Sequence, residues 1–351
     1  MKSTKMNIRL SYFVPCFFYV AIVQSTVPYM TMNGGVKMPA IGYGTFLMMN
    51  ETVLKIALNE ALKVGYRHID TAQFYMNEQV VGKVLNEWLS SGKLKREDLF
   101  VTTKLHIINE FPHKVDSALK ESLEKLQLDY VDLFLIHFPI AVDLTKEGGF
   151  VPRPTDLVGV WKKMEEQVDL GRTRTIGVSN FNQTQMEKIM SHARIKPANH
   201  QLELHPYYQQ RELRRYCRKH NIVVVAYSSL GAPGFYEFVK SVGLDPIKVP
   251  PVLDNPEIKR IAAKHKRTAA QVILRFVYQL GVVVIPKSDH KNRIKENFQI
   301  FDFSLDRNDM KQMRKLDLGA QGKIFDFKFL HPEIFDHPEY PFADLKYRKA
   351  T

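Results

Sequence analysis

Cysteine and tryptophan are scarce in this chain. Its 351 residues include two cysteines, Cys16 and Cys217, and two tryptophans, Trp88 and Trp161. Two cysteines exclude a fold held by several disulfides, and a chain of this length has enough apolar residues for a core without them. We expect Cys217, which lies in a helical stretch, to be a small buried residue; a reactive thiol is the alternative.

Long apolar runs are also lacking. Residues 12–23 are apolar, but about 12 residues are too few to cross a bilayer comfortably. Three basic residues precede this run and small residues follow it, an arrangement that resembles a secretory signal peptide. We therefore expect residues 1–25 to be a signal peptide, residues 26–351 to form one domain, and the protein to be secreted. A cytoplasmic enzyme with an N-terminal extension is the alternative.

Two N-glycosylation sequons gain meaning if the chain is secreted. They are Asn50-Glu51-Thr52 and Asn182-Gln183-Thr184. Sequons also arise by chance, so glycosylation at Asn50 and Asn182 remains an expectation that depends on secretion.

The chain is basic but has no nucleic-acid motif. It has 50 Lys and Arg against 37 Asp and Glu, a net charge of +13. Removing residues 1–25 takes away three basic residues and no acidic one, which leaves +10. The basic residues are scattered over many expected helices, with no arginine-rich arm. We therefore expect a solvated basic surface and no nucleic-acid partner.

A glycine-rich dinucleotide motif is missing as well. No G-x-G-x-x-G is present, and Gly42-Tyr43-Gly44 lacks the third glycine. A Rossmann site is therefore unsupported, and any nucleotide must be bound in another way.

Regular alternation of strand and helix patterns is the main feature that is present. Apolar, β-branched runs recur on average about every 35 residues, near positions 40, 68, 99, 131, 174, 199, 222 and 282. Helical patterns lie between or after them, at 53–64, 78–89, 115–126, 157–170, 185–190, 212–220, 256–280 and 294–300. Eight strands alternating with helices predict an α/β fold, a (β/α)8 TIM barrel. Asn33-Gly34-Gly35 predicts a β-hairpin before the first strand, and residues 305–316 predict a further helix.

Polar residues follow three of the short apolar runs. Asp70, Lys104 and His137 each end such a run, and Tyr75 lies just beyond the first. The C-terminal ends of barrel strands meet on one face, so we expect these side chains to converge.

Their chemistry suits reduction of a carbonyl, which needs a hydride at carbon and a proton at oxygen. Tyr75 is a poor proton donor at its ordinary pKa of about 10, so we expect the Lys104 ammonium to lower that pKa and Asp70 to hold the ammonium in place. His137 would donate a hydrogen bond to the substrate oxygen. One alternative is a purely structural salt bridge. Another is a Schiff-base aldolase using Lys104, which leaves Tyr75 and His137 unexplained.

Segments around these residues resemble the aldo-keto reductase superfamily. They are GYRHIDTAQFY, VTTKL and LIHFP, followed by GVSNF at 177–181, AYSSLG at 226–231 and IPKS at 285–288. The resemblance implies Asp70, Tyr75, Lys104 and His137 as a catalytic tetrad and a monomer that reduces aldehydes and ketones with NADPH. It also implies a hairpin that plugs the N-terminal end of the barrel and a tail after Asp317 that folds over the active site. His137 favours carbonyl reduction, because the family's steroid double-bond reductases carry Glu there.

The same resemblance implies a coenzyme site without a metal ion. Two cations and a hydroxyl near the start of a helix would bind the 2′-phosphate, as such a position suits an anion. Two neighbours would contact adenine, three residues the nicotinamide carboxamide, one aromatic its ring, and one short segment the pyrophosphate. The phosphate residues are Lys287, Arg293 and Ser288, and the adenine contacts are Glu296 and Asn297. The carboxamide contacts are Ser179, Asn180 and Gln201, and the aromatic residue on the nicotinamide ring is Tyr227. The pyrophosphate segment runs from Ser228 to Gly231 and includes Leu230.

Three expected pocket residues differ from many relatives. Phe46, His106 and Phe138 stand where aldose-reductase-like members have Trp, and together with His137 they are the expected substrate contacts. Loss of three indoles predicts a wider pocket and a preference for bulky carbonyls over small sugars. Some secreted arthropod members reduce 3-oxo-ecdysteroids, so a secreted ketosteroid reductase is one alternative. A non-catalytic NADPH-binding protein is another.

Overall fold

The structure is a computed structural model that describes residues 27–146, 148–241, 243, 249–327 and 330–342. The expected signal peptide at 1–25, with Cys16, lies outside the described residues. Among the described residues, no helix has both the length and the apolarity needed to span a membrane.

Eight parallel strands form the central barrel, in the order β12-β11-β10-β9-β6-β5-β4-β3. A parallel bridge between Ile41 and Val284 joins the first strand to the last, and the Gly44 amide donates to the Pro286 carbonyl at 3.2 Å. The predicted barrel is confirmed. Its strands are β3 (Gly42–Gly44), β4 (His68–Asp70), β5 (Phe100–Leu105), β6 (Leu133–Ile136), β9 (Ile176–Ser179), β10 (Asn199–Glu203), β11 (Val223–Tyr227) and β12 (Val283–Val284).

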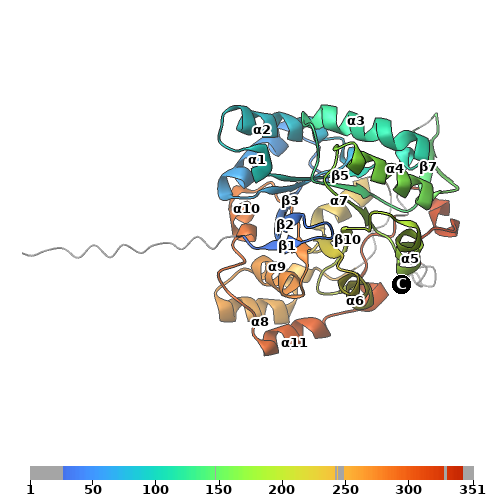
Figure 1. Cartoon of the computed structure of the whole chain (residues 1–351). Helices are drawn as coiled ribbons and strands as arrows, with labels where there is room; N and C mark the ends of the chain where they lie inside the picture. The colour runs from blue at the N-terminus through green and yellow to red at the C-terminus, as the bar shows by residue number, and fades with distance from the viewer. Residues whose placement is uncertain (1–26, 147, 242, 244–248, 328–329, 343–351) are drawn as a thin grey trace, which may run out of the picture.

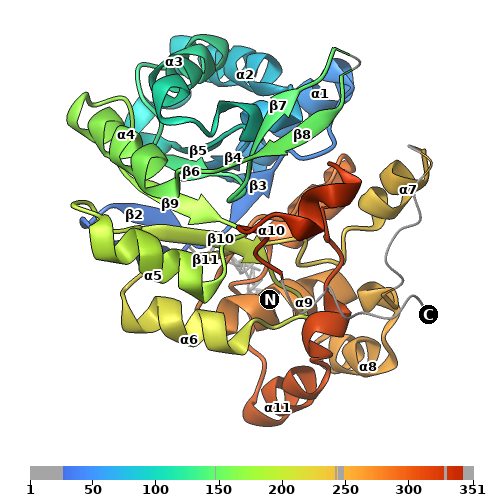
Figure 2. The same cartoon turned by 90° about the vertical axis from the view of Figure 1, so that its right-hand side faces the viewer.

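Helices surround the barrel (Figures 1 and 2). Gly82 shows how closely two of them pack, because a Cβ atom there would lie 2.3 Å from the Lys125 carbonyl oxygen on the next helix. The helices are α1 (Glu51–Val64), α2 (Glu78–Ser90), α3 (Val115–Leu126), α4 (Leu157–Asp169), α5 (Gln183–His192), α6 (Arg211–Lys219), α7 (Pro233–Ser241), α8 (Pro256–His265), α9 (Ala269–Gln279), α10 (Lys291–Phe298) and α11 (Arg307–Lys315).

Three features differ from the expected elements. The helix expected at 256–280 is two helices, because Lys266 has a left-handed backbone (φ +53°) and Thr268 caps α9 in a capping box with Gln271. Helix α7 was not expected. Neither was the antiparallel hairpin β7 (Ala141–Leu144) and β8 (Phe150–Arg153), which follows β6.

The N-terminal hairpin plugs one end of the barrel, as predicted. Its strands are β1 (Tyr29–Thr31) and β2 (Lys37–Pro39), and it lies at the centre of the ring of helices in Figure 1. Met32 and Met38 pack with Leu133 and other residues at the start of barrel strands. The Asn33 side chain donates to the carbonyls of Pro197 and His220.

Cys217 is fully buried on α6, as predicted. Burial raises the pKa of its thiol to about 12, so the thiolate needed for reactivity is disfavoured.

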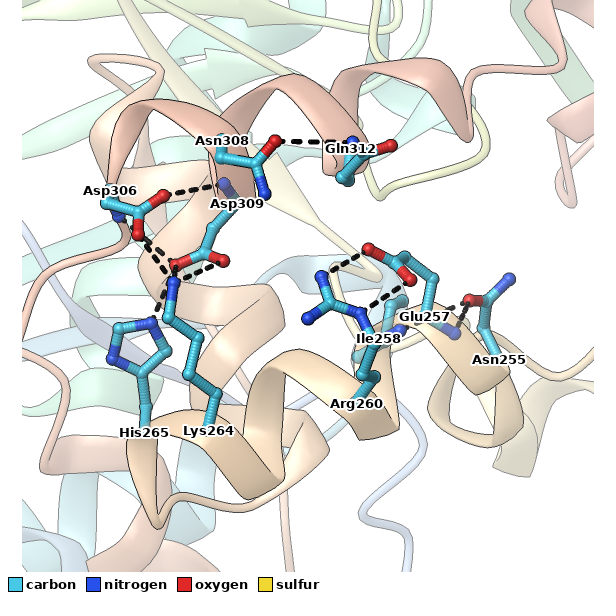
Figure 3. A network of polar contacts seen from close by, with 10 residues as sticks. All are labelled: Asn255, Glu257, Ile258, Arg260, Lys264, His265, Asp306, Asn308, Asp309 and Gln312. Carbon is cyan, nitrogen blue, oxygen red and sulfur yellow. Dashed lines mark hydrogen bonds and ion pairs between the residues drawn. The ribbon is translucent and has the colours of Figure 1, made fainter.

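A polar network fixes α11, the last helix before the tail, against α8 (Figure 3). Asp309 is buried and accepts hydrogen bonds from Lys264 at 2.9 Å and from His265 at 2.7 Å. Asp306 caps α11 by accepting from the Asp309 amide at 2.8 Å. The network therefore sets where the tail begins.

Candidate active site

The Lys104 ammonium is the centre of the polar cluster at the C-terminal ends of β4, β5 and β6. It donates to Asp70 Oδ1 at 2.6 Å, to the Thr71 carbonyl at 2.9 Å and to Tyr75 Oη at 3.1 Å. An ammonium has three N–H groups, and each has an acceptor here. The phenol oxygen of Tyr75 thus accepts from Lys104, and its own O–H remains free to donate elsewhere.

Local structure places these residues together. Asp70 is the last residue of β4 and pairs in register with Thr102 of β5, two residues before Lys104. The short 3-10 helix Gln73–Tyr75 turns the chain back, so that the Tyr75 ring lies 4.7 Å from the Lys104 ammonium. His137 follows β6, and its ring lies edge-on to Tyr75 at 5.5 Å between centroids.

Burial controls the protonation of the cluster. Burial raises the pKa of Tyr75, and the opposing effect of Lys104 does not cancel it, so the expectation of a lowered phenol pKa is wrong for this geometry. Burial also opposes the charge of Lys104, but Asp70 and Tyr75 outweigh it and hold its pKa above the ordinary value. Burial, with Lys104 and His106, lowers the pKa of His137 well below its usual range. Near neutral pH the site therefore holds a protonated phenol, an ammonium and a neutral imidazole.

The expected carboxamide contacts join this cluster. Gln201 Nε2 donates to Asp70 Oδ2 at 2.7 Å. Asn180 Nδ2 donates to the His137 carbonyl at 2.9 Å and to Ser179 Oγ at 3.0 Å, and Asn180 Oδ1 accepts from the Tyr227 hydroxyl at 2.6 Å. Hydrogen bonds therefore connect Gln201 to Asp70 and Lys104 of the tetrad, and a second set connects Ser179, Asn180 and Tyr227 to the backbone of His137.

Two of the expected coenzyme residues have a left-handed backbone. Asn180 has φ +64° and Ser228 has φ +55°, a region that residues other than glycine rarely adopt. Such strain persists where the surrounding structure holds it, often at functional sites.

A cavity of about 610 Å³ opens above the cluster. Three tetrad residues line it, while Lys104 is buried behind them. All eleven expected coenzyme residues line it too: Ser179, Asn180, Gln201, Tyr227, Ser228, Leu230, Lys287, Ser288, Arg293, Glu296 and Asn297.

Of the expected substrate contacts, Phe46, His137 and Phe138 line the cavity, but His106 does not. His106 begins a 3-10 turn, and its Nδ1 accepts from the Ile108 amide at 3.1 Å. Its ring packs on Phe74 at 5.2 Å, and Phe74 itself lines the cavity. In this structure Phe74 provides that part of the wall, and contact of His106 with substrate remains a prediction.

The far end of the cavity fits a phosphate group. Lys287 and Arg293 line it, and neither forms an ion pair with any residue in the described part of the chain. Helix α10 begins at Lys291, and its N-cap residue, His290, makes no side-chain capping bond, so the first amides of the helix lack that acceptor. These two cations, without an ion-pair partner in the described ranges, form with the Ser288 hydroxyl and a helix N-terminus the kind of donor set that a nucleotide phosphate requires.

Several cavity residues were missed from the sequence. Phe235 comes from α7, and Phe325, Phe327 and Leu330 come from the tail. The tail thus covers the active site, as expected, although its contacts were not placed. The aromatic residues in the tail were a visible signal, but nothing in their spacing showed which would face inward. No cluster of three or more His, Cys, Asp or Glu suited to a metal ion occurs in the described ranges.

Comparisons with known proteins agree with this geometry. Residues 40–318 match the model of the Aldo/keto reductase family. The chain is 42% identical over 329 residues to prostaglandin F synthase 1 of Bos taurus, across 89% of this chain and 97% of that protein. It is 40% identical over 326 residues to aldo-keto reductase family 1 member C4 of Homo sapiens, with coverage of 89% and 97%.

A solved structure, the aldose reductase from Schistosoma japonicum, is 35% identical with a TM-score of 0.79 and covers 90% of this chain and 99% of its own. The matched range includes the whole barrel, the tetrad and the expected coenzyme residues. The chain therefore belongs to the aldo/keto reductase family of oxidoreductases, whose members use NADH or NADPH.

Proposed function

We propose that this protein is a monomeric, NADPH-dependent reductase of aldehydes and ketones, with Tyr75 as the proton donor. The arrangement of Lys104 carries the proposal, because its three N–H groups are directed at three oxygens. This keeps the ammonium charged and leaves the Tyr75 O–H directed to a substrate.

The residues of the chain divide the work as follows. Bound NADPH supplies the hydride that the carbonyl carbon receives. His137, neutral because of its lowered pKa, donates a hydrogen bond that orients the carbonyl oxygen. Tyr75 gives its proton to that oxygen, and the phenolate that forms is stabilised by the Lys104 ammonium 3.1 Å away. Asp70 holds the ammonium, and Gln201 holds Asp70.

NADPH is preferred to NADH in this proposal because Lys287 and Arg293 have no carboxylate partner among the described residues. A 2′-phosphate would supply the missing negative charge, whereas the ribose hydroxyl of NADH would not.

Bulky apolar carbonyls are the proposed substrate class. Aromatic and aliphatic side chains form the wall around the tetrad: Phe46, Phe74, Phe138, Phe325, Phe327 and Leu330. A large apolar ligand gains about 25 cal/mol for each Å² removed from water, whereas a small sugar has little such surface. The name of the bovine relative, prostaglandin F synthase 1, also indicates a lipid-sized product for that protein.

The test is NADPH oxidation by the purified protein with an aromatic aldehyde, a keto-steroid and glyceraldehyde. We expect turnover with all three and the highest kcat/KM for the two bulky carbonyls. Binding of NADPH without turnover of any carbonyl would refute the reductase and favour a non-catalytic binding protein.

We further propose that residues 1–25 direct the protein to the secretory route, with a glycan on Asn50. Asn50 is exposed and caps α1 through its Oδ1 atom, so its amide nitrogen is open to attachment. Asn182 is less suitable, because it is half-buried in a capping box and its Nδ2 donates to Pro341 of the tail.

Expression of tagged full-length protein in animal cells should give protein in the medium that starts near Thr26 and loses mass with N-glycosidase. Cytosolic protein that retains Met1 would contradict the proposal.

A further inference from the structure

Glu203 is a buried acid that neither the tetrad nor the coenzyme residues include. It is the last residue of β10, two positions after Gln201, and its side chain is fully buried. Its Oε1 accepts from His205 Nε2 at 3.1 Å and from the Ile324 amide at 2.5 Å. Its Oε2 accepts from Lys323 Nζ and from the Phe325 amide, both at 3.1 Å. Three of these four donors belong to the tail.

The segment before these donors is docked on the loop after β10. The Leu318 amide donates to the Tyr207 carbonyl at 2.8 Å. A Cβ atom at Gly322 would lie 1.9 Å from the same oxygen, so only glycine permits this approach. The tail therefore packs closely against the loop after β10 before it reaches Glu203.

Phe325 connects the anchored tail segment to the active site through its ring contacts. Its ring stacks on Phe235 of α7, with 4.0 Å between centroids and 26° between planes. It also meets the Tyr227 ring edge-on at 5.5 Å. Helix α7 begins at Pro233, two positions after Gly231, which ends the segment expected at the pyrophosphate. One tail residue thus touches both the expected nicotinamide contact and the helix next to the pyrophosphate segment.

Lys323 is held from its other side as well. Its ammonium lies 3.7 Å from the centroid of Phe342, and Phe342 stacks on Phe327 of the cavity wall at 5.9 Å. The ion pair with Glu203 therefore supports two parts of the tail, Phe325 directly and Phe327 through Phe342.

We propose that Glu203 is a positioning residue that joins the substrate wall to helix α7: by holding residues 323–325 it keeps Phe325 stacked on Phe235. This inference rests on the proposed NADPH site. Pro233, Gly234 and Phe235 of α7 line the cavity together with the expected coenzyme residues. Movement of α7 away from the cavity requires Phe235 to leave Phe325, so we expect the tail anchor to slow coenzyme release and at the same time to shape the bulky-substrate pocket.

The decisive variant is Glu203→Gln, which keeps size but removes the charge that pairs with Lys323. We expect NADPH dissociation, followed by stopped-flow fluorescence, to become about tenfold faster or more, since lid opening commonly limits release. KM for a keto-steroid should rise by a similar factor. Single-turnover reduction of glyceraldehyde should stay within about twofold, because the tetrad is untouched.

Glu339→Gln is the matched control. It removes a tail ion pair with Lys188 of α5 at 2.7 Å that does not involve Glu203 or Phe325. The rate of NADPH dissociation and the rate of single-turnover reduction should therefore match wild type. Phe325→Leu and Phe235→Leu keep the buried carboxylate and test the stacking alone. Each should speed NADPH release, and the double variant should release no faster than the faster single variant if the rings act as one latch.

A folded Glu203→Gln protein with unchanged release and unchanged keto-steroid KM would overturn the inference. If Glu203→Gln does not fold, Phe325→Leu decides: unchanged release there overturns it, and faster release supports it. Failure of the proposed function looks different, because the wild-type protein would then show no NADPH binding or no carbonyl turnover.

Discussion

Replacing Tyr75 with Phe separates proton donation from every other role of the ring. The contacts with Phe46 at 5.0 Å and His137 at 5.5 Å are made by the ring and remain. The lost groups are the O–H donor and the oxygen that accepts from Lys104 at 3.1 Å. A positioned general acid contributes roughly 10²- to 10⁴-fold, so kcat should fall at least about 100-fold, or ~2.7 kcal/mol in the barrier. One buried N–H of Lys104 also loses its acceptor, which should cost about 1–3 kcal/mol of folding stability.

The two effects need separate measurements. Thermal unfolding gives the stability change, fluorescence titration gives the NADPH Kd, and steady-state NADPH oxidation with an aromatic aldehyde gives kcat. The Kd should not change, because no coenzyme contact is assigned to the hydroxyl. Tyr130→Phe is the control, since Tyr130 packs beneath Arg96 and does not line the cavity. A folded Tyr75→Phe protein that keeps more than about a tenth of wild-type kcat, a loss under ~1.4 kcal/mol, would exclude Tyr75 as the main acid.

Three further substitutions test the phosphate site and the polar network between α8 and α11. Arg293→Ala should weaken NADPH by about 1.5–3 kcal/mol in fluorescence titrations and NADH much less, and Lys287→Ala should act likewise; equal weakening of both coenzymes would show that the 2′-phosphate is bound elsewhere. Asp309→Asn should lower the free energy of unfolding by about 1–3 kcal/mol at neutral pH. Burial opposes ionisation of Asp309, but the bonds from His265 and Lys264 outweigh it and lower its pKa. Its stabilisation is therefore present above the unfolded pKa of about 3.9 and is lost as pH falls, so denaturant curves of the two proteins should converge in acid; a constant difference would contradict this.

The barrel was predictable because its signal is repeated. Each strand and helix pattern was weak by itself, but eight strand patterns that alternate with helix patterns are compatible with few folds other than this barrel. The error at 256–280 shows the limit of periodicity, since the apolar face continues through the break. Lys266 turns with positive φ without a glycine or proline to mark it. The capping pair Thr268 and Gln271 was visible in the sequence and would have located the start of α9.

The active site was predictable wherever strand geometry fixes a side chain. Asp70 and Lys104 end adjacent strands, and Asp70 is in register with Thr102, two residues before Lys104, so the fold brings the two side chains together. His106 lies one residue beyond its strand, where its Nδ1 accepts from the Ile108 amide, so strand geometry alone does not fix its direction. The pKa of Tyr75 was misjudged for another reason. Its direction depends on the balance of burial against Lys104, and the sequence names the charges but not the extent of burial.

The width of the pocket depends on the tail as well as on the barrel. Three missing indoles predict a wider cavity if the rest of the wall is unchanged. In the structure, however, Phe327 stacks on Phe138 at 4.3 Å, and Phe325 lies 6.4 Å from Phe46, so tail aromatics occupy part of the space. Phe138 is almost completely buried by this stacking. A larger ring at Phe138 would therefore press on the tail before it narrowed the cavity. Since Glu203 of β10 pairs with Lys323 of the tail, we expect the size limit for substrates to depend on contacts between β10 and the tail.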